Sequence, residues 1–266
     1  KKKKRMKVTK GNKRKCPDNE SIETSNINSK SIIEEEDYST ENYWNERYKS
    51  GTSWEWYFNY ETLKPLLEGY LGKERDSNVL EIGCGDKPLT LDLFEDGHKG
   101  NLMGIDFADS VIEQLRKDPK LARSKGRCKV EKMDARELKY ADETFDVIID
   151  KGTLDAMSCS EASWHSNIHR ISAEVGRVLK SPGCFIVCSH VGLESDEFDD
   201  FIRNLVEGVA GTAKFPITPK LWIHCSENEE CPTVYVLQKL PRVFTRSWEN
   251  NKQHGLTNIS TTICQY

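Results

Sequence analysis

The sequence predicts an α/β fold: a doubly wound, mostly parallel seven-stranded sheet with an antiparallel terminal hairpin. Short apolar, β-branched runs alternate with stretches of helical periodicity between residues 78 and 210, which is typical of a parallel sheet covered by helices. The first run, 78–82, leads directly into Gly83-Cys-Gly85, the tight turn of a strand–loop–helix unit. Two last strand-like runs, 221–225 and 233–237, are joined by about seven polar residues. This is too short for a crossover helix, so the runs should pair antiparallel.

The predicted elements follow in a regular order. Five parallel strands are expected, at 78–82, 101–105, 127–131, 145–149 and 184–188. Apolar spacing predicts helices between and after them, at 88–94, 108–115, 168–179 and 198–209. Ahead of the glycine loop, 43–48 and 63–71 are predicted as helices, with the aromatic segment 54–58 between them.

The composition indicates one folded domain flanked by polar segments. A chain of 266 residues with 36% hydrophobic side chains can bury one substantial core. Residues 1–37 contain almost no large apolar side chains, so we expect a disordered basic and polar leader. The folded domain is expected to span residues 38–240, and residues 241–266 to form a polar C-terminal tail.

Charge is distributed unevenly along the chain. Residues 1–15 carry ten Lys or Arg and no acid, so a net charge of −4 for the whole chain leaves −14 on the remainder. The basic leader is compatible with a nuclear-import signal, a nucleic-acid contact or a solvated linker, and composition does not separate them. We do not expect nucleic-acid contact through this leader to be the main function.

Composition also restricts the compartment and excludes some cofactors. No apolar run approaches the roughly 18 residues that a membrane span needs, and no apolar segment of signal-peptide type follows the basic start. Nine cysteines without a Cys-x-x-Cys pair favour reduced thiols, so we expect a cytoplasmic protein, with a nuclear location as the alternative. His224, Cys225 and Cys231 lack a fourth ligand and finger-like spacing, so no metal site is expected.

Acidic residues recur at the ends of four consecutive predicted strands, namely Glu81, Asp106, Asp134 and Asp150. Ligands of an open parallel sheet bind at the carboxyl ends of its strands. Gly83 and Gly85 would let the backbone approach such a ligand, and the following helix would offer free amides. The sequence therefore predicts a nucleotide-type site at this edge of the sheet.

Spacing suggests how a nucleoside would bind there. Asp106 follows the glycine loop by about twenty residues, the separation at which a carboxylate binds both ribose hydroxyls. Asp134 would accept a hydrogen bond from an exocyclic adenine amine, while the backbone amide of Ala135 would face the ring. Each acid alone could equally be a solvated loop residue, and their recurrence at neighbouring strand ends favours a site.

Several motifs resemble a known family. Glu81-Ile-Gly-Cys-Gly85, Gly104-Ile-Asp106, Met133-Asp-Ala135 and Asp150 at the end of Phe145-Asp-Val-Ile-Ile149 resemble the class I, seven-stranded S-adenosylmethionine-dependent methyltransferases. Two further stretches, Tyr43-Trp-Asn-Glu-Arg-Tyr48 with Glu55-Trp-Tyr57, and Asp150-Lys-Gly-Thr-Leu-Asp-Ala156, resemble the methyltransferase-like subgroup of lysine methyltransferases of translation elongation factor 1-alpha. The resemblance covers about residues 38 to 240.

The resemblance implies a set of cofactor contacts for S-adenosylmethionine, carried over onto Trp44, Tyr48, Trp56, Gly83, Asp106, Asp134, Ala135 and Lys151. It moves the aromatic residues from the core, where composition alone would place them, to a pocket, because ring faces suit a sulfonium cation. The subgroup usually continues its Gly-Cys-Gly motif with Asn-Ser, whereas Asp86-Lys87 follows here. Asp86 could instead contact the ammonium group of the methionine moiety.

The function that the resemblance implies is methyl transfer from S-adenosylmethionine to a protein lysine, with elongation factor 1-alpha as the acceptor. We expect Asp150 to orient the acceptor amine, and Trp54, Trp56 and Tyr57 to form the acceptor channel. Three alternatives remain. An NAD-dependent dehydrogenase would need a third glycine where Pro88 stands; a methyltransferase of RNA or of a small molecule, and a non-catalytic binding module, share the same fold.

Overall fold

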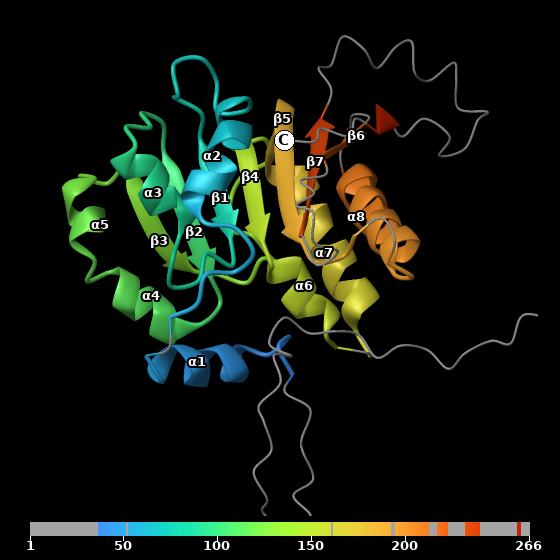
Figure 1. Ribbon diagram of the computed structural model, residues 1–266, viewed down its shortest axis with the longest axis horizontal. Helices are drawn as coiled ribbons and strands as arrows, with labels where there is room; N and C mark the ends of the chain where they lie inside the picture. Colours follow the sequence, from blue (N-terminus) through green and yellow to red (C-terminus); the bar gives the residue numbers. More distant parts are fainter. Residues whose placement is uncertain are drawn as a thin grey trace, which may run out of the picture.

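The computed structural model describes residues 37–51, 53–160, 162–192, 195–212, 217–222, 232–239 and 260–261. Almost all of the predicted leader, most of the predicted tail, and His224, Cys225 and Cys231 lie outside these residues. The described chain forms a twisted sheet with helices on both faces (Figure 1). This is the α/β architecture that the alternating pattern predicts.

The sheet has the strand order β3-β2-β1-β4-β5-β7-β6-β8. Its strands are β1 (Val79–Ile82), β2 (Leu102–Asp106), β3 (Cys128–Lys132), β4 (Phe145–Lys151), β5 (Leu179–Ser189), β6 (Ile217–Trp222), β7 (Thr233–Lys239) and β8 (Ser260–Thr261). The strands β3, β2, β1, β4 and β5 are parallel, and β7 is antiparallel to both β5 and β6. The terminal hairpin is therefore confirmed, whereas the two-residue β8, parallel to β6, is an eighth strand that the sequence did not predict.

The helices are α1 (Glu41–Lys49), α2 (Tyr60–Glu68), α3 (Leu89–Glu95), α4 (Asp109–Leu115), α5 (Pro119–Arg123), α6 (Thr153–Ser158), α7 (Trp164–Val178) and α8 (Phe198–Thr212). The short α5 and α6 were not predicted, because five or six residues are too few to show a helical period. Leu179, predicted at the end of a helix, instead begins β5, where it pairs with Phe145 of β4.

Alternating residues of the strands divide the core into two layers. Val79 packs with the α2, α3 and α4 side, whereas its neighbour Leu80 packs with the α7 and α8 side. In a strand, successive side chains point to opposite faces, so this alternation shows directly that the sheet is covered on both sides. The doubly wound prediction is confirmed.

Helix α1 lies across the end of the sheet toward which the arrowheads of β1, β2 and β4 point (Figure 1). Its start is capped by the Thr40 hydroxyl, which accepts from the Tyr43 amide at 3.4 Å. Its side is fastened to α4, because Asn45 accepts hydrogen bonds from both the amide and the hydroxyl of Ser110. Helix α1 thus covers the carboxyl ends of the strands.

In the part of the chain that the structure describes, no helix is long and apolar enough to cross a membrane. Within the same residues, no group of three or more His, Cys, Asp or Glu side chains is arranged to hold a metal ion. Cys84, Cys128, Cys184 and Cys188 are buried free thiols.

Candidate functional site

The glycine loop after β1 has a backbone that a side chain would obstruct. Gly83 and Gly85 both have φ of +57°, in the left-handed region. A Cβ on Gly83 would lie 1.9 Å from Oγ1 of Thr153, the first residue of α6. Thr153 donates from that hydroxyl to the Ile82 carbonyl at 3.0 Å, so α6 packs directly on the loop.

Glu81 has a different role from the one that its position suggested. Its carboxylate accepts hydrogen bonds from the Leu89 and Thr90 amides, each at 3.0 Å, and from the Thr90 hydroxyl at 3.1 Å. These are the first two residues of α3, which has no side-chain cap of its own. The predicted free amides at the start of α3 are therefore already bound, and burial raises the pKa of Glu81 to about 7 despite these donors.

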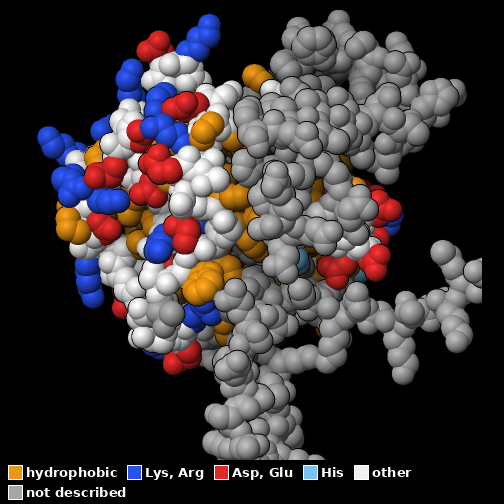
Figure 2. Space-filling view, viewed as in Figure 1, with side chains coloured by type: hydrophobic (Ala, Val, Ile, Leu, Met, Phe, Trp, Pro, Cys, Tyr) orange, Lys and Arg blue, Asp and Glu red, His pale blue; other side chains and the backbone are white. Residues whose placement is uncertain are grey.

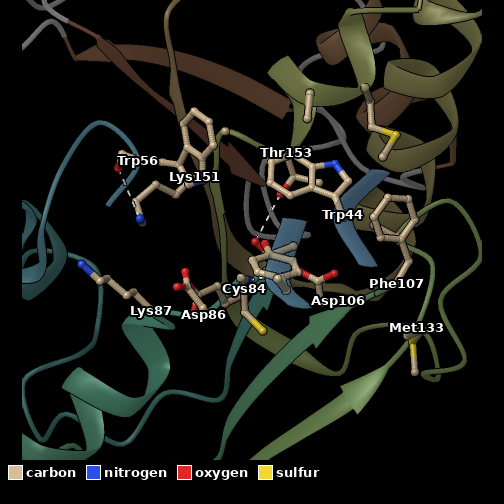
Figure 3. Close-up of a pocket in the computed structure, with 18 of the residues that line it drawn as sticks. Trp44, Trp56, Cys84, Asp86, Lys87, Asp106, Phe107, Met133, Lys151 and Thr153 are labelled. Atoms are coloured by element: carbon tan, nitrogen blue, oxygen red, sulfur yellow. Dashed lines mark hydrogen bonds between the residues drawn. The ribbon is translucent and has the colours of Figure 1, made fainter. Parts of the chain in front are cut away.

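Asp106, at the end of β2, holds the glycine loop from the other side. Its carboxylate accepts from the Gly85 amide at 3.1 Å and from the Ala108 amide at 2.9 Å. The residue is 4% exposed, and burial raises its pKa to about 6. In the close-up, Asp106 lies between Cys84 and Phe107 (Figure 3). Two donors leave further lone pairs on this carboxylate for a ligand.

Three aromatic side chains, Trp44, Tyr48 and Trp56, line the same cavity as the glycine loop and form an aromatic wall. Trp44 and Tyr48 come from α1, four residues apart and so on one helix face, with ring centroids 5.7 Å apart. Trp56 packs edge-on against Trp44 at 6.0 Å, and the Arg47 guanidinium lies over the Trp56 ring at 5.3 Å. Trp54 is 47% exposed, the one large hydrophobic side chain in the described chain with that much exposure.

Lys151, at the end of β4, ties the aromatic segment to the sheet. Its side chain is only 7% exposed; the ammonium binds Glu55 at 2.7 Å and the Trp56 carbonyl at 3.2 Å (Figure 3). Placing a lysine in so dry a position requires such partners. The contact holds Trp56 against the cavity.

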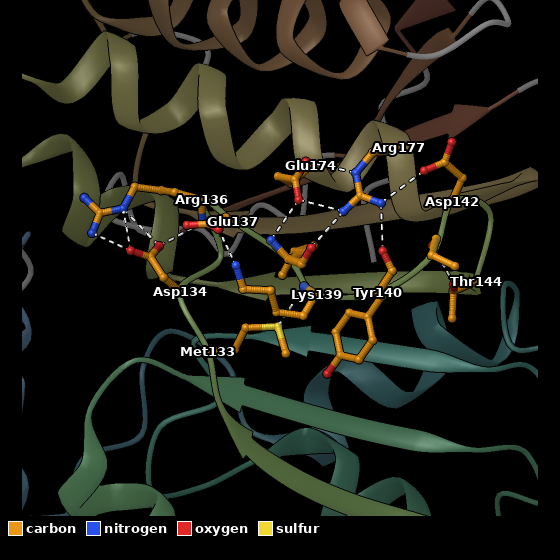
Figure 4. Close-up of polar contacts among 12 residues, drawn as sticks. Met133, Asp134, Arg136, Glu137, Lys139, Tyr140, Asp142, Thr144, Glu174 and Arg177 are labelled. Carbon is orange, nitrogen blue, oxygen red and sulfur yellow. Dashed lines mark hydrogen bonds and ion pairs between the residues drawn. The ribbon is translucent and has the colours of Figure 1, made fainter.

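Asp134 follows β3 and is already engaged by its neighbour Arg136 (Figure 4). Arg136 donates from Nε to Oδ1 at 2.9 Å and from Nη2 to Oδ2 at 2.7 Å. Burial opposes ionisation of Asp134, but these donors outweigh it and lower its pKa. A ligand amine at Asp134 would therefore share a carboxylate that an arginine already orients, which the sequence did not indicate.

These groups surround one cavity that is open to solvent. All ten cofactor-binding candidates line it: Trp44, Tyr48, Trp56, Glu81, Gly83, Gly85, Asp106, Asp134, Ala135 and Lys151. Sequence reasoning did not assign to the site the other lining residues Cys84, Lys87, Phe107, Met133, Gly152, Thr153, Ala156, Met157 and Ile171. Of these, Phe107 and Met133 adjoin predicted acids, and that adjacency was the available signal.

Asp150, the predicted catalytic residue, lies outside the lining of this cavity. It is fully buried; one carboxylate oxygen accepts from the Leu154 amide at 3.2 Å, and Oδ2 has no hydrogen-bond partner. Burial and then the nearby Asp155 raise its pKa well above the usual value. Of the predicted acceptor-channel residues, Trp54 and Trp56 line the cavity, whereas Tyr57 is not part of its lining and contacts Gly152, which is.

Comparison with known proteins gives one matching family and several similar proteins. A methyltransferase domain family matches residues 73–235. The eEF1A lysine and N-terminal methyltransferase of Danio rerio is 33% identical over 216 residues, 79% of this chain and 29% of that protein. EEF1A lysine methyltransferase 4 of Mus musculus is 31% identical over 160 residues, 56% of this chain and 60% of that protein.

The mouse eEF1A lysine and N-terminal methyltransferase is 32% identical over 156 residues, 58% of this chain and 22% of that protein. The chain thus spans about a quarter of the length of these longer relatives. Among solved structures, a TehB-like SAM-dependent methyltransferase from Corynebacterium glutamicum superposes with a TM-score of 0.50 at 14% identity, covering 75% of this chain and 97% of that one. At this identity the superposition supports the fold alone.

Proposed function

The chain belongs to the methyltransferase domain family, and from that premise we propose that it transfers the methyl group of S-adenosylmethionine to a protein lysine, with translation elongation factor 1-alpha as the acceptor. We assign the activity to residues 38–240, a range that contains the matched residues 73–235.

One observation carries the proposal: an open glycine loop, a buried carboxylate and an aromatic wall border the same cavity. The residues fit S-adenosylmethionine in three respects. Asp106 retains lone pairs for ribose hydroxyls, the positive-φ glycines present backbone without side chains, and Trp44, Tyr48 and Trp56 supply ring faces suited to a cation. Asp134 and Ala135 would hold the adenine, and Asp86 the ammonium group of the methionine moiety.

S-adenosylmethionine supplies a methyl group already activated by a sulfonium, so the protein has to bring a neutral nitrogen into line with it. A free lysine has a pKa of about 10.4, and presenting it uncharged near pH 7 costs roughly 4–5 kcal/mol. Asp150 is our candidate for orienting the amine; because it is fully buried outside the cavity lining, it would act through the start of α6, which it holds at the Leu154 amide. Its charge would raise the pKa of the amine, so orientation and deprotonation need separate groups.

The choice of acceptor rests on the similar proteins and on charge. Those relatives are named as eEF1A lysine methyltransferases, and the Asp150–Ala156 motif resembles their subgroup. Outside its first 15 residues the chain carries −14, and acidic side chains gather at the right of Figure 2, where α8 begins with Asp199 and Asp200. Such a field attracts a basic surface, so activity should fall as salt rises. We place the reaction in the cytoplasm, where the elongation factor works.

The test is mass spectrometry of purified elongation factor 1-alpha after incubation with the protein and S-adenosylmethionine. We expect added methyl groups on one or more lysines with the wild type and a loss of at least about tenfold with Asp106→Ala, which removes the proposed ribose contact. Asp92→Ala, an acid of α3 that pairs with Lys120 outside the cavity lining, is the matched control and should retain activity. Labelled RNA or a different labelled protein would leave the methyltransferase standing and refute the acceptor.

A further inference from the structure

His190 stands at the open end of the sheet beside the predicted acceptor motif. It follows directly after β5, whose Val187 and Cys188 pair with Asp150 and Lys151 at the end of β4. The Gly152 amide donates to the Cys188 carbonyl at 3.1 Å, which keeps the two strand ends together. Because β4 and β5 are parallel, their carboxyl ends open onto the crevice where ligands of such sheets bind.

Asp155 of α6 fixes the His190 ring. Oδ2 of this carboxylate lies 3.1 Å from Nδ1 of His190 and also accepts from the His190 amide at 2.9 Å. Oδ1 accepts from the Ser189 hydroxyl at 2.6 Å. Nδ1 therefore carries the proton, and Nε2 has no hydrogen-bond partner in the described chain. The His190 side chain is 29% exposed, so part of the ring is open to solvent.

Tyr57 connects this cluster to the cavity. Its hydroxyl donates to Asp155 at 2.5 Å and lies 3.4 Å from Nδ1 of His190. Its backbone has φ of +57°, an unfavourable conformation for a bulky residue. The ring also packs on Gly152, where a Cβ would lie only 3.2 Å from Cε2 of the tyrosine. Gly152 lines the cavity, so Tyr57 connects the cluster to the cavity through Gly152.

We propose that His190, oriented by Asp155 and Tyr57, accepts the proton that the acceptor ammonium must lose before methyl transfer. This inference rests on the proposed function, and it supplies the deprotonating group that Asp150 cannot be. One N–H bond of the acceptor breaks and an Nε2–H bond forms; the amine keeps its electron pair as the nucleophile, and the imidazolium later releases the proton to water.

The surroundings suit such a proton acceptor. Burial lowers the pKa of His190, but Asp155, and to a lesser extent Glu197, raise it above the ordinary value. The titratable groups facing the ring are Asp155 from α6, Tyr57 from the aromatic segment and Glu197 before α8. A base is most effective when its pKa lies near the working pH, and histidine is the side chain whose ordinary pKa lies closest to neutrality.

The test compares kcat against pH for the wild type, His190→Gln and His169→Gln. His169 is an exposed histidine of α7 and is the matched control. For His190→Gln we expect a fall in kcat of about 100-fold near pH 7.5, within the range of general-base effects. The kcat of His190→Gln should keep rising at pH values where the kcat of the wild type has already levelled off. Its KM for S-adenosylmethionine should stay within about twofold of the wild-type KM. His169→Gln should match the wild type.

A second readout needs no methyl transfer. NMR titration of the imidazole should show the Nδ1–H tautomer and a raised pKa for His190, and Asp155→Asn should lower that pKa. Tyr57→Phe removes a hydrogen-bond donor that competes with His190 for Asp155. The pKa of His190 should therefore be higher in this variant than in the wild type. If the wild type methylates a protein and His190→Gln keeps the wild-type pH profile, the inference is wrong and the function stands. If the wild type methylates nothing, the proposed function and the inference about His190 are both wrong.

Discussion

The two halves of the open sheet edge use acidic residues differently. On the half formed by β1, β2 and β3, Glu81 binds the start of α3, and Asp106 binds the two loops beside it. Asp134 binds an arginine two residues away. On the half formed by β4 and β5, Asp155 instead joins side chains from two separate segments, Tyr57 of the aromatic segment and Ser189 and His190 at the end of β5.

This difference separates a rigid binding surface from a group that can exchange protons. Carboxylates that accept backbone amides are fixed by their own loops and serve mainly to shape those loops. A carboxylate shared by a tyrosine, a serine and a histidine has several side-chain donors that compete for it, and two of these, the tyrosine and the histidine, can titrate. The first half is therefore suited to holding a cofactor, and the second to handling the acceptor.

The largest effect should come from disturbing the contact where the two halves meet. Gly83→Ala places a Cβ 1.9 Å from Thr153 of α6 at a φ of +57°. Strain and overpacking together should destabilise the fold by about 3–5 kcal/mol and abolish cofactor binding. Urea unfolding and calorimetry measure both quantities.

Gly97→Ala isolates the strain in that comparison. Gly97 has φ of +82° but nothing within 4 Å of an added Cβ. Gly97→Ala should lower the free energy of unfolding by only about 1–2 kcal/mol and leave cofactor affinity unchanged. Equal losses for the two variants would mean that packing between loop and α6 contributes nothing.

The next effect tests the binding half alone. Asp106→Ala removes a buried acceptor of two backbone amides and the proposed ribose ligand. Affinity for S-adenosylmethionine should weaken by about 1.5–3 kcal/mol, as for a lost hydrogen bond to a charged group. Calorimetry with Asp92→Ala, an acid of α3 paired with Lys120 outside the cavity, provides the control. Unchanged affinity in Asp106→Ala would place the cofactor elsewhere.

The pKa values of Asp150 and Asp155 are shifted in opposite directions, so replacing each one should change the free energy of unfolding differently. The pKa of Asp150 is raised in the folded state, so its ionisation above the unfolded pKa opposes folding increasingly as pH rises. Asp150→Asn should therefore gain stability relative to the wild type between pH 5 and pH 8, as measured by urea unfolding. The same variant should lose turnover far more than cofactor affinity if Asp150 orients the amine.

The pKa of Asp155 is lowered: burial raises it, but His190, Ser189 and Tyr57 outweigh burial. Its contribution to stability is present above the unfolded pKa and is lost as pH falls through the folded one. Asp155→Asn should thus cost about 1–3 kcal/mol at both pH 5 and pH 8, since donors lose their acceptor. A loss confined to pH 8 would contradict this assignment.

The smallest effect concerns neither half. Residues 1–37 have few apolar side chains, so their removal should change the free energy of unfolding and the affinity for S-adenosylmethionine by less than about 0.5 kcal/mol. Thermal melting and calorimetry of the shortened chain measure this. Lost cofactor binding would show that the leader belongs to the folded domain.

The sequence by itself determined the fold class and the antiparallel hairpin, and it indicated acids and glycines at one edge of the sheet that the structure brings to one cavity. The reason is that strand alternation, glycine turns and acids at strand ends are local patterns, and parallel pairing brings all the strand ends to one edge. Trp44 and Tyr48, four residues apart, could likewise be expected to share a helix face once their family resemblance pointed to a pocket.

Only the tertiary structure decided what each acid contacts. Nothing in the local sequence shows that Glu81 caps α3, that Arg136 already binds Asp134, or that Asp150 is buried outside the cavity lining. The cluster of Tyr57, Asp155 and His190 joins residues up to 133 positions apart. Such contacts depend on how β5 pairs with β4 and how the aromatic segment packs on Gly152, and neither leaves a periodic signal in the chain.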